Sequence, residues 1–350
     1  METVANHFAS AAAPNLLTVS IVVVTVNRPD CVTRCLDALF NQTVQPHQII
    51  VVDSSRDDRT RNVVARYPSV EYIADPNLFG RMTASRNVAL FHTTGDIISF
   101  IDDDAYAHPT WLQNLIAAYD SPNIGAIGGR ALNGQPGEAL MGRNQIGKLT
   151  ANGFVLGNFA ADPGGIVDVD HIIGCNMSFR REVLAELGGF REDFAGISGL
   201  CEDTDMSLRV KAKGYRIRFQ PTACVDHVGA PQASGRRFDS RYQFYHRRNS
   251  FVLLLRNFGF SLTVFRFPFA IAAQASREFI RNTGQAFARF ISSFAGLAMG
   301  LIAGAKLYFK HGKDPTRHDA AADAIRQALS RTPQSTVQAD STQRTVTISR

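Results

Sequence analysis

The segment Ser99-Phe100-Ile101-Asp102-Asp103-Asp104-Ala105 decides the fold, because it joins a buried strand directly to three carboxylates. In open α/β sheets, ligands bind outside the carboxyl ends of the strands, so these side chains point to the expected site. Two carboxylates on one turn can hold Mg²⁺ or Mn²⁺ together with substrate phosphates. One Asp is also explained as the cap of the following helix. Three adjacent acids repel each other unless a cation is present, so we favour a metal site.

Apolar strands alternate with helices on both sides of this segment. Strands are expected at 19–24, 49–52, 72–73 and 97–101, with helices after Asp30 with Leu36, Leu39 and Phe40 on one face, around 63–64 and at 83–91. Continuous apolar strands separated by helices are typical of a parallel sheet covered on both faces. The sequence therefore predicts an α/β, Rossmann-like, mostly parallel sheet flanked by helices, of a nucleotide-binding type.

The pattern is looser further along the chain. A helix is expected at 111–119, followed by strands and long loops in the glycine-rich region 125–165. Regular structure is expected again as a strand-like run at 168–180, helices at 181–187 and 203–212, and strands at 216–219 and 223–228.

Length and cysteine content exclude several classes of protein. A chain of 350 residues with 45% hydrophobic residues is too long and too apolar to be disordered, collagen-like or stapled by disulfides. Its five cysteines are an odd number and show neither a C-x-x-C pair nor zinc spacing: Cys31, Cys35, Cys175, Cys201 and Cys224. This usage fits a reducing cytoplasm. The first 17 residues show no secretory signal pattern.

Positive charge is concentrated in residues 241–313, which hold eleven Lys and Arg and one acid, Glu278. This excess is larger than the net charge of the whole chain, +6, so the rest of the chain is acidic. Phe, Leu and Ile alternate with these basic residues, which favours helices lying in the interface of an anionic membrane. Residues 290–305 are uncharged but shorter than a usual span. The alternative is a set of core helices packed on the preceding domain.

Other polar residues follow the earlier strands. Asp53 ends the second strand, where a carboxylate can accept hydrogen bonds from a ribose or a base, although an Asx turn explains it equally well. Arg86 and Asn87 could face a diphosphate. The first strand is followed by neither G-x-G-x-x-G nor G-x-x-x-x-G-K-[ST], which disfavours dinucleotide dehydrogenases and P-loop enzymes.

A second acidic group, Glu202-Asp203-Thr204-Asp205, opens the helix at 203–212. Capping and the helix dipole account for one or two of these acids. A reaction that displaces a diphosphate also needs a general base apart from the metal ligands, which an Asp or Glu here can supply. His227 follows an expected strand and, taken alone, is explained as a core or capping residue.

Taken together, residues 19–259 resemble the family 2 glycosyltransferases of GT-A fold. Seven pieces carry the resemblance in the order of the family: Val19 to Arg28; Ile50 to Ser55; Asn77 to Gly80 with Ala84 to Asn87; Asp102 to Asp104; Gly174 to Arg180; Gly188 to Phe190; and Glu202 to Asp205 with Arg209 and Gly214-Tyr215. The family implies inverting transfer of a sugar from a nucleoside diphosphate donor, dependent on Mn²⁺ or Mg²⁺.

The resemblance implies a role for each matching residue. Asp203 is expected to deprotonate the acceptor hydroxyl, and Asp102, Asp104 and His227 to hold the metal. The remaining expected site residues are those on the donor side, Thr25, Asn27, Arg28, Asp53, Arg86, Asn87, Asp102 and Asp103, and those on the acceptor side, Glu202 and Asn176.

The chain departs from the processive members of the family, because no Q-x-x-R-W follows the acidic motif and no clear set of spanning helices is present. We therefore expect a single addition to a lipid-linked or polysaccharide acceptor of the cell surface, on the inner face of the membrane. The Tyr245 to Asn249 run resembles rhamnosyltransferase-like members more weakly. Alternatives are a sugar nucleotidyltransferase, whose usual basic glycine-rich first loop is absent, and a non-catalytic membrane-associated scaffold. Nucleic-acid binding is disfavoured, because the basic residues are interleaved with apolar runs.

The expected domain organisation has four parts. A flexible N-terminus covers residues 1–15 and the glycosyltransferase domain covers 16–240. A basic, apolar helical region that associates with membranes covers 241–313, and a polar tail covers 314–350.

Overall fold

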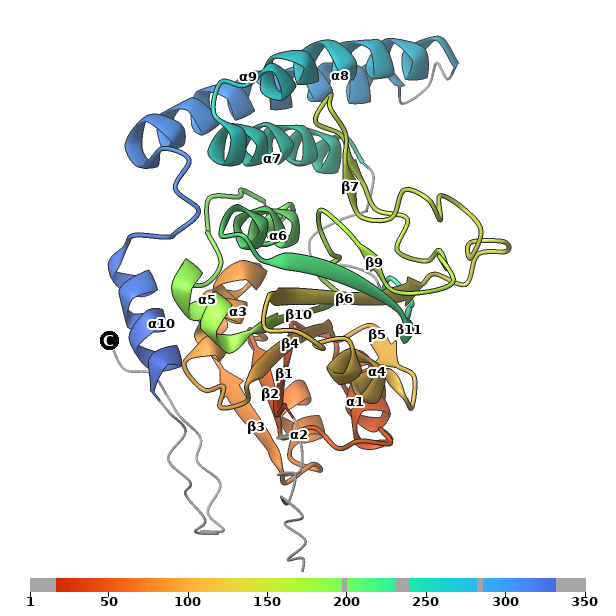
Figure 1. The fold of residues 1–350 in the computed structure, drawn as a ribbon, viewed down its shortest axis with the longest axis vertical. Helices are drawn as coiled ribbons and strands as arrows, with labels where there is room; N and C mark the ends of the chain where they lie inside the picture. The colour runs from red at the N-terminus through yellow and green to blue at the C-terminus, as the bar shows by residue number, and fades with distance from the viewer. Residues whose placement is uncertain (1–16, 197–199, 231–238, 282–285, 332–350) are drawn as a thin grey trace, which may run out of the picture.

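A mixed nine-stranded sheet forms the centre of the molecule in a computed structural model that describes residues 17–196, 200–230, 239–281 and 286–331 (Figure 1). The strand order is β3-β2-β1-β4-β10-β6-β11-β5, with β9 paired to β11 outside this path. The strands of this sheet are β1 (Val19–Thr25), β2 (Gln48–Asp53), β3 (Val70–Ala74), β4 (Ile97–Asp102), β5 (Ala105–Ala107), β6 (Ile124–Leu132), β9 (Val167–Asp168), β10 (Asn176–Arg180) and β11 (Arg216–His227).

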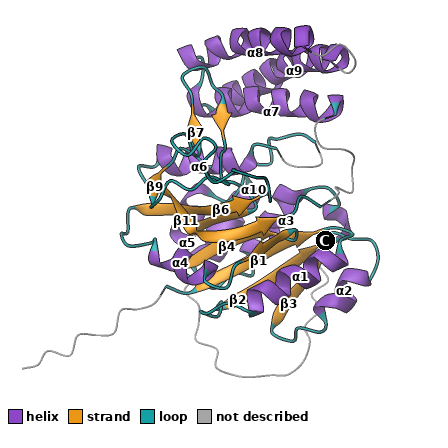
Figure 2. Ribbon diagram, turned by 90° about the vertical axis from the view of Figure 1, so that its right-hand side faces the viewer, coloured by secondary structure: helices purple, strands orange, loops and turns teal. Residues whose placement is uncertain are grey.

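Helices cover the sheet and extend beyond it. They are α1 (Pro29–Phe40), α2 (Arg59–Val64), the 3₁₀ helix η1 (Pro76–Leu78), α3 (Met82–Leu90), α4 (Trp111–Ala117), α5 (Arg181–Leu187), α6 (Glu202–Ala212), α7 (Ser240–Phe258), α8 (Leu262–Arg281), α9 (Ala286–His311) and α10 (Ala320–Ser330). A separate hairpin of β7 (Lys148–Leu149) and β8 (Val155–Leu156) rises from the sheet toward α7 and α8 (Figures 1 and 2).

The first four strands of the chain form a parallel sheet that is covered on both faces, as their apolar runs predicted. β1 pairs in parallel with β2 and β4, and β2 pairs in parallel with β3. Because side chains alternate along a strand, Val22 of β1 is buried in the core on one face of the sheet and Val23 in the core on the other. Strands buried on both faces read as unbroken apolar runs, so the predicted α/β fold with a mostly parallel first half is confirmed.

The second half of the sheet is less regular than expected. β10 runs antiparallel between β4 and β6, so the run at 168–180 holds two strands separated by a loop. The two strands expected at 216–219 and 223–228 form one strand, β11, with a register shift between Gln220 and Cys224. The bulge lets one strand pair with both β6 and β5.

The C-terminal region also differs from the expectation of a polar tail after residue 314. α10 forms within it and packs on α5 and α3, with Ala322 buried and with Ile325 and Leu329 buried in the main core. These residues follow helical spacing, but the polar residues between them obscured it. Residues 1–15 and the end of the expected tail lie outside the described residues.

Candidate active site

A cavity of about 480 Å³ lies at the carboxyl ends of β1 and β4. Its floor includes Thr25, the carboxylates of Asp102 and Asp104 at the end of β4, and the first turn of α6. Its roof comes from α7, from Phe267 of α8 and from Phe154 at the tip of the β7–β8 hairpin. The cavity therefore lies between the α/β domain and the C-terminal helices.

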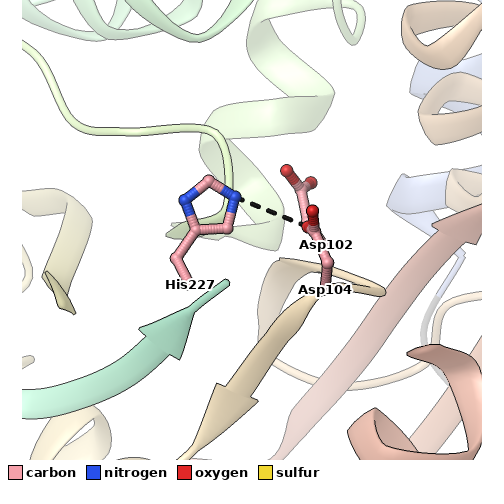
Figure 3. Close-up of side chains that lie close together, drawn as sticks. All are labelled: Asp102, Asp104 and His227. Carbon is pink, nitrogen blue, oxygen red and sulfur yellow. Dashed lines mark ion pairs between the residues drawn. The ribbon is translucent and has the colours of Figure 1, made fainter. Parts of the chain in front are cut away.

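Three potential metal ligands converge on this cavity: Asp102, Asp104 and His227 (Figure 3). One ligand atom of each lies within 4.8 Å of those of the other two. Antiparallel pairing of β11 with β5 places His227 opposite Ala105, beside Asp104, so strand register brings residues 123 positions apart together. Oδ1 of Asp104 lies 3.4 Å from Nε2 of His227.

The donor set of this cluster fits a divalent cation. Two carboxylates and an imidazole suit Mn²⁺, and the carboxylates suit Mg²⁺. Nε2 of His227 is buried and lacks a hydrogen bond to any described residue, despite its proximity to Asp104. Burial lowers the pKa of His227, but Asp104 and Cys175 outweigh burial and raise that pKa to about 11. Without a cation, a proton would thus balance the negative charge of this cluster.

The middle carboxylate of the run has a different environment. Asp103 is fully buried and accepts hydrogen bonds from Thr25 Oγ1 at 2.6 Å and from Arg28 Nε at 2.9 Å. Burial raises the pKa of Asp103 to about 7, while Arg28 opposes this shift. Asp103 thus holds Thr25 and Arg28, which line the cavity, and does not itself line it.

Arg86 connects the two acidic groups. Its fully buried guanidinium donates to Glu202 Oε1 at 2.7 Å, to Asp102 Oδ1 at 3.2 Å and to the carbonyl oxygen of Gly174 at 3.3 Å. Burial and the adjacent Asp203 raise the pKa of Glu202 to about 8, while Arg86 lowers it. Arg86 therefore fixes Asp102, a candidate metal ligand, relative to the first turn of α6.

Asp203 lies in that first turn and lines the cavity. Its Oδ2 accepts a hydrogen bond from the backbone N–H of Gly174 at 2.9 Å, and its Oδ1 accepts one from the N–H of Thr204 at 2.6 Å. The side chain is only partly buried, in contrast to Glu202. Its carboxylate is therefore held by two backbone groups and faces the cavity, as a general base requires.

Two residues expected on the nucleoside side do not line the cavity. Asn27 is exposed, has a positive φ of 55°, and its N–H donates to Ser55 Oγ. The buried carboxylate of Asp53 accepts hydrogen bonds from Ser55 Oγ at 2.5 Å and from the Tyr72 hydroxyl at 2.7 Å. The neighbouring Ser54 lines the cavity in its place.

Two other expected site residues hold the surrounding fold. Asn87 exchanges hydrogen bonds with the backbone N–H and carbonyl oxygen of Phe190, so it fixes the turn after α5. Asn176 is fully buried, donates to the carbonyl oxygens of Arg130 and Ala223, and accepts from the Trp111 indole at 2.9 Å. The structure does not bring either side chain to the cavity.

Several cavity residues were missed by sequence reasoning. His171 contacts Thr204 beside Asp203, and Phe154 packs on Phe267 with ring centroids 6.0 Å apart. Tyr242 and Arg247 of α7 line the roof. The basic and apolar pattern of 241–313 favoured membrane-facing helices, with helices packed on the preceding domain as the alternative, and it did not indicate which residues would line the cavity.

Comparison with known proteins identifies the family. Residues 20–188 match the family model described as glycosyl transferase family 2, a range that includes β1, β4 and the Asp102 to Asp104 run. These residues belong to glycosyl transferase family 2. A solved relative by fold is the mannosyltransferase PcManGT from Pyrobaculum calidifontis in complex with GDP-Man and Mn²⁺, with a TM-score of 0.53 and 20% identity. The match covers 84% of this chain and 88% of that one, and shows the GT-A fold.

Sequence relatives within family 2 include two O-antigen chain rhamnosyltransferases. WbaN of Salmonella anatum is 28% identical over 192 residues, which are 54% of this chain and 59% of WbaN. RfbN of Salmonella typhimurium is 26% identical over 211 residues, which are 60% of this chain and 66% of RfbN. The chain thus matches less than two thirds of the length of either relative.

Proposed function

We propose that this protein is an inverting glycosyltransferase that moves a sugar from a nucleoside diphosphate to a hydroxyl of a lipid-linked or polysaccharide acceptor. One observation carries the proposal: the Asp102, Asp104 and His227 cluster and the carboxylate of Asp203 line the same cavity. Transfer needs both, because positive charge must stabilise the leaving diphosphate and a base must accept the proton of the attacking hydroxyl. Arg86 donates hydrogen bonds to Asp102 and to Glu202, and so fixes the position of the cluster relative to the first turn of α6.

In this mechanism, Asp203 takes the proton of the acceptor hydroxyl as its oxygen attacks the anomeric carbon. The attack comes from the face opposite the diphosphate, which inverts the configuration. Asp102, Asp104 and His227 would hold Mn²⁺ or Mg²⁺. Such a cation, when bound, stabilises the charge of the departing diphosphate. Thr25 and Arg28, held by Asp103, would contact the donor, and the α7 roof would exclude water.

Cell-surface glycan assembly is the proposed setting. The names of WbaN and RfbN support transfer of a hexose or deoxyhexose in polysaccharide synthesis. A single addition by a cytoplasmic enzyme, peripheral on the inner face of the membrane, agrees with the basic, apolar region 241–313. Thr25 and Glu202 line the cavity and remain the proposed donor-side and acceptor-side residues, whereas Asn27, Asp53, Asn87 and Asn176 would act on these sides only by positioning neighbouring residues.

A thermal-shift panel tests the proposal. UDP, dTDP, GDP and CMP are each added with and without Mn²⁺, because a ligand that binds only the folded state raises the melting temperature. One nucleotide is expected to give a shift that requires Mn²⁺, which names the donor. Folded protein with no shift for any of them would contradict the proposal and favour the non-catalytic scaffold.

A further inference from the structure

Helices α8 and α9 expose an unusual number of large apolar side chains. Phe265 and Phe269 of α8 are 67% and 64% exposed, and Ile302 of α9 is 64% exposed. We define the α8–α9 face as the exposed large apolar residues of these helices and of the turn before α8: Phe260, Leu262, Phe265, Phe269, Phe287, Ile291, Phe294, Met299, Leu301, Ile302 and Phe309. Exposed apolar surface of this extent marks a contact site.

Among the described residues, α9 over Phe287–His311 is the one helix long and apolar enough to cross a membrane. Its packing ties it closely to α7. Gly296, Gly300 and Gly304 lie four residues apart on the face that packs against α7, and a Cβ at Gly300 would lie 2.7 Å from the carbonyl oxygen of Arg248. α9 is thus in close backbone contact with α7 along its length.

α7 is in turn fixed to the catalytic domain. Asn249, fully buried, donates to the carbonyl oxygens of Ala195 and Leu200, and Arg256 contacts Asp193 at 3.2 Å. Arg256 also donates to the carbonyl oxygen of Gly312, directly after α9. The end of α9 is therefore tied to the helix that roofs the cavity.

Chain topology gives an independent argument. α7 precedes α9 and packs on the catalytic domain, and α10 follows α9 and packs on α5 and α3 of the same domain. A single crossing by α9 would place α10 on the opposite side of the bilayer from α5. The described fold therefore excludes a single crossing by α9, and no second described helix is long and apolar enough to return the chain across a membrane.

Charge distinguishes a lipid surface from a second copy of the chain. Exposed basic residues flank the apolar ones: Arg266, Arg277, Lys306 and Lys310. α9 has no acidic residue and α8 has one, Glu278. A two-fold dimer through this face would bring the same patch against itself, so basic groups would face basic groups. Anionic headgroups supply the missing negative charge.

We propose that the α8–α9 face lies flat in the interface of an anionic leaflet, without crossing it, and presents the cavity to an acceptor whose lipid tail stays in the bilayer. The second part rests on the proposed function. Phe267 lines the cavity and is 1% exposed, whereas Phe265 and Phe269, two residues away on either side, are in the apolar face. One helix thus separates the membrane from the roof of the cavity.

Vesicle flotation tests the docking. Wild-type protein is expected to float with phosphatidylglycerol vesicles and far less with phosphatidylcholine vesicles. Phe269→Glu with Ile302→Glu should weaken the binding to anionic vesicles at least about tenfold, because two apolar contacts become like-charge repulsions. The matched control, Phe91→Glu with Leu140→Glu, replaces exposed apolar residues elsewhere and should bind like the wild type. Equal flotation of both double variants would overturn the proposal.

Two further measurements separate the competing explanations. A membrane-impermeant maleimide should label Lys313→Cys, above the wild-type cysteine background, in protein bound to the outside of sealed vesicles; protection of this position would indicate a crossing. Light scattering without lipid should give a monomer; a dimer abolished by the Phe269 and Ile302 substitutions, together with no flotation, would overturn lipid docking. The Mn²⁺-dependent nucleotide shift should persist in that variant, so failure of docking and failure of the catalytic proposal give different results.

Discussion

Charged side chains are buried at the edge of the sheet, whereas apolar side chains are exposed on α8 and α9. Around the cavity, Arg86 and Asp103 are about 1% and 0% exposed and are paired with opposite charges. On the outer helices, four phenylalanines are more than 60% exposed: Phe265, Phe269, Phe287 and Phe309. Both arrangements cost stability, because burial desolvates charge and exposure leaves apolar surface in water.

The difference indicates what each region contacts. Paired charges in a buried network hold Asp102 and Asp203 in fixed positions, which a reaction with a small polar donor needs. The exposed apolar groups of α8 and α9 still leave much of their surface in water, so contact with an external apolar surface would stabilise them.

Asp104→Asn should have the largest effect on metal binding, since it removes a charged ligand from the Asp102, Asp104 and His227 cluster. We expect the affinity for Mn²⁺, measured by titration calorimetry, to fall at least about 100-fold, beyond the loss typical of outer-shell substitutions. Asp226→Asn is the matched control, because Asp226 adjoins His227 in sequence but is exposed. Equal losses in both variants would argue against the cluster as a metal site.

Asn176→Ala should lower the free energy of unfolding by about 3 kcal/mol, because it leaves the Trp111 N–H and two carbonyl oxygens buried without their partner. Urea unfolding followed by circular dichroism measures the effect. Asn62→Ala, at an exposed position, should change it little. A stable Asn176→Ala protein that loses only transfer would restore the acceptor-side role expected from the sequence.

Gly300→Leu should destabilise the contact between α9 and α7 by about 2 kcal/mol, since the new side chain collides with α7 backbone. Ala298→Leu places the same side chain on the exposed side of α9 and should be nearly neutral in urea unfolding. If the two variants have the same free energy of unfolding, close packing at Gly300 does not hold α9 against α7.

The smallest predicted effect concerns Glu202, whose pKa burial and Asp203 raise to about 8 from an ordinary value of 4.5. Between these values the folded chain keeps a proton that the unfolded chain releases, so stability falls as pH rises through about 8. Glu202→Gln cannot titrate. Its free energy of unfolding relative to wild type should therefore rise by about 1 kcal/mol between about pH 7 and pH 8. A difference independent of pH would contradict the shifted pKa.

Much of the sheet and its acidic edge could be predicted, because β1, β2 and β4 are unbroken apolar runs that end in polar residues. The distinct role of Asp103 could not, since three consecutive Asp residues look alike until Thr25 and Arg28 are placed in space. The position of α7 over the cavity could not be predicted either. An amphipathic pattern shows that a helix has two faces and not which neighbour each face contacts.

The most direct test of the account measures two properties of Asp203→Asn in one preparation. The first is Mn²⁺-dependent binding of the nucleotide identified by the thermal-shift panel. The second is sugar transfer from the corresponding donor to a membrane lipid extract of the producing organism. We predict binding within about twofold of wild type and transfer reduced about 1,000-fold, in the range for loss of a general base. Full transfer by this variant would remove Asp203 from its role and contradict the proposed mechanism.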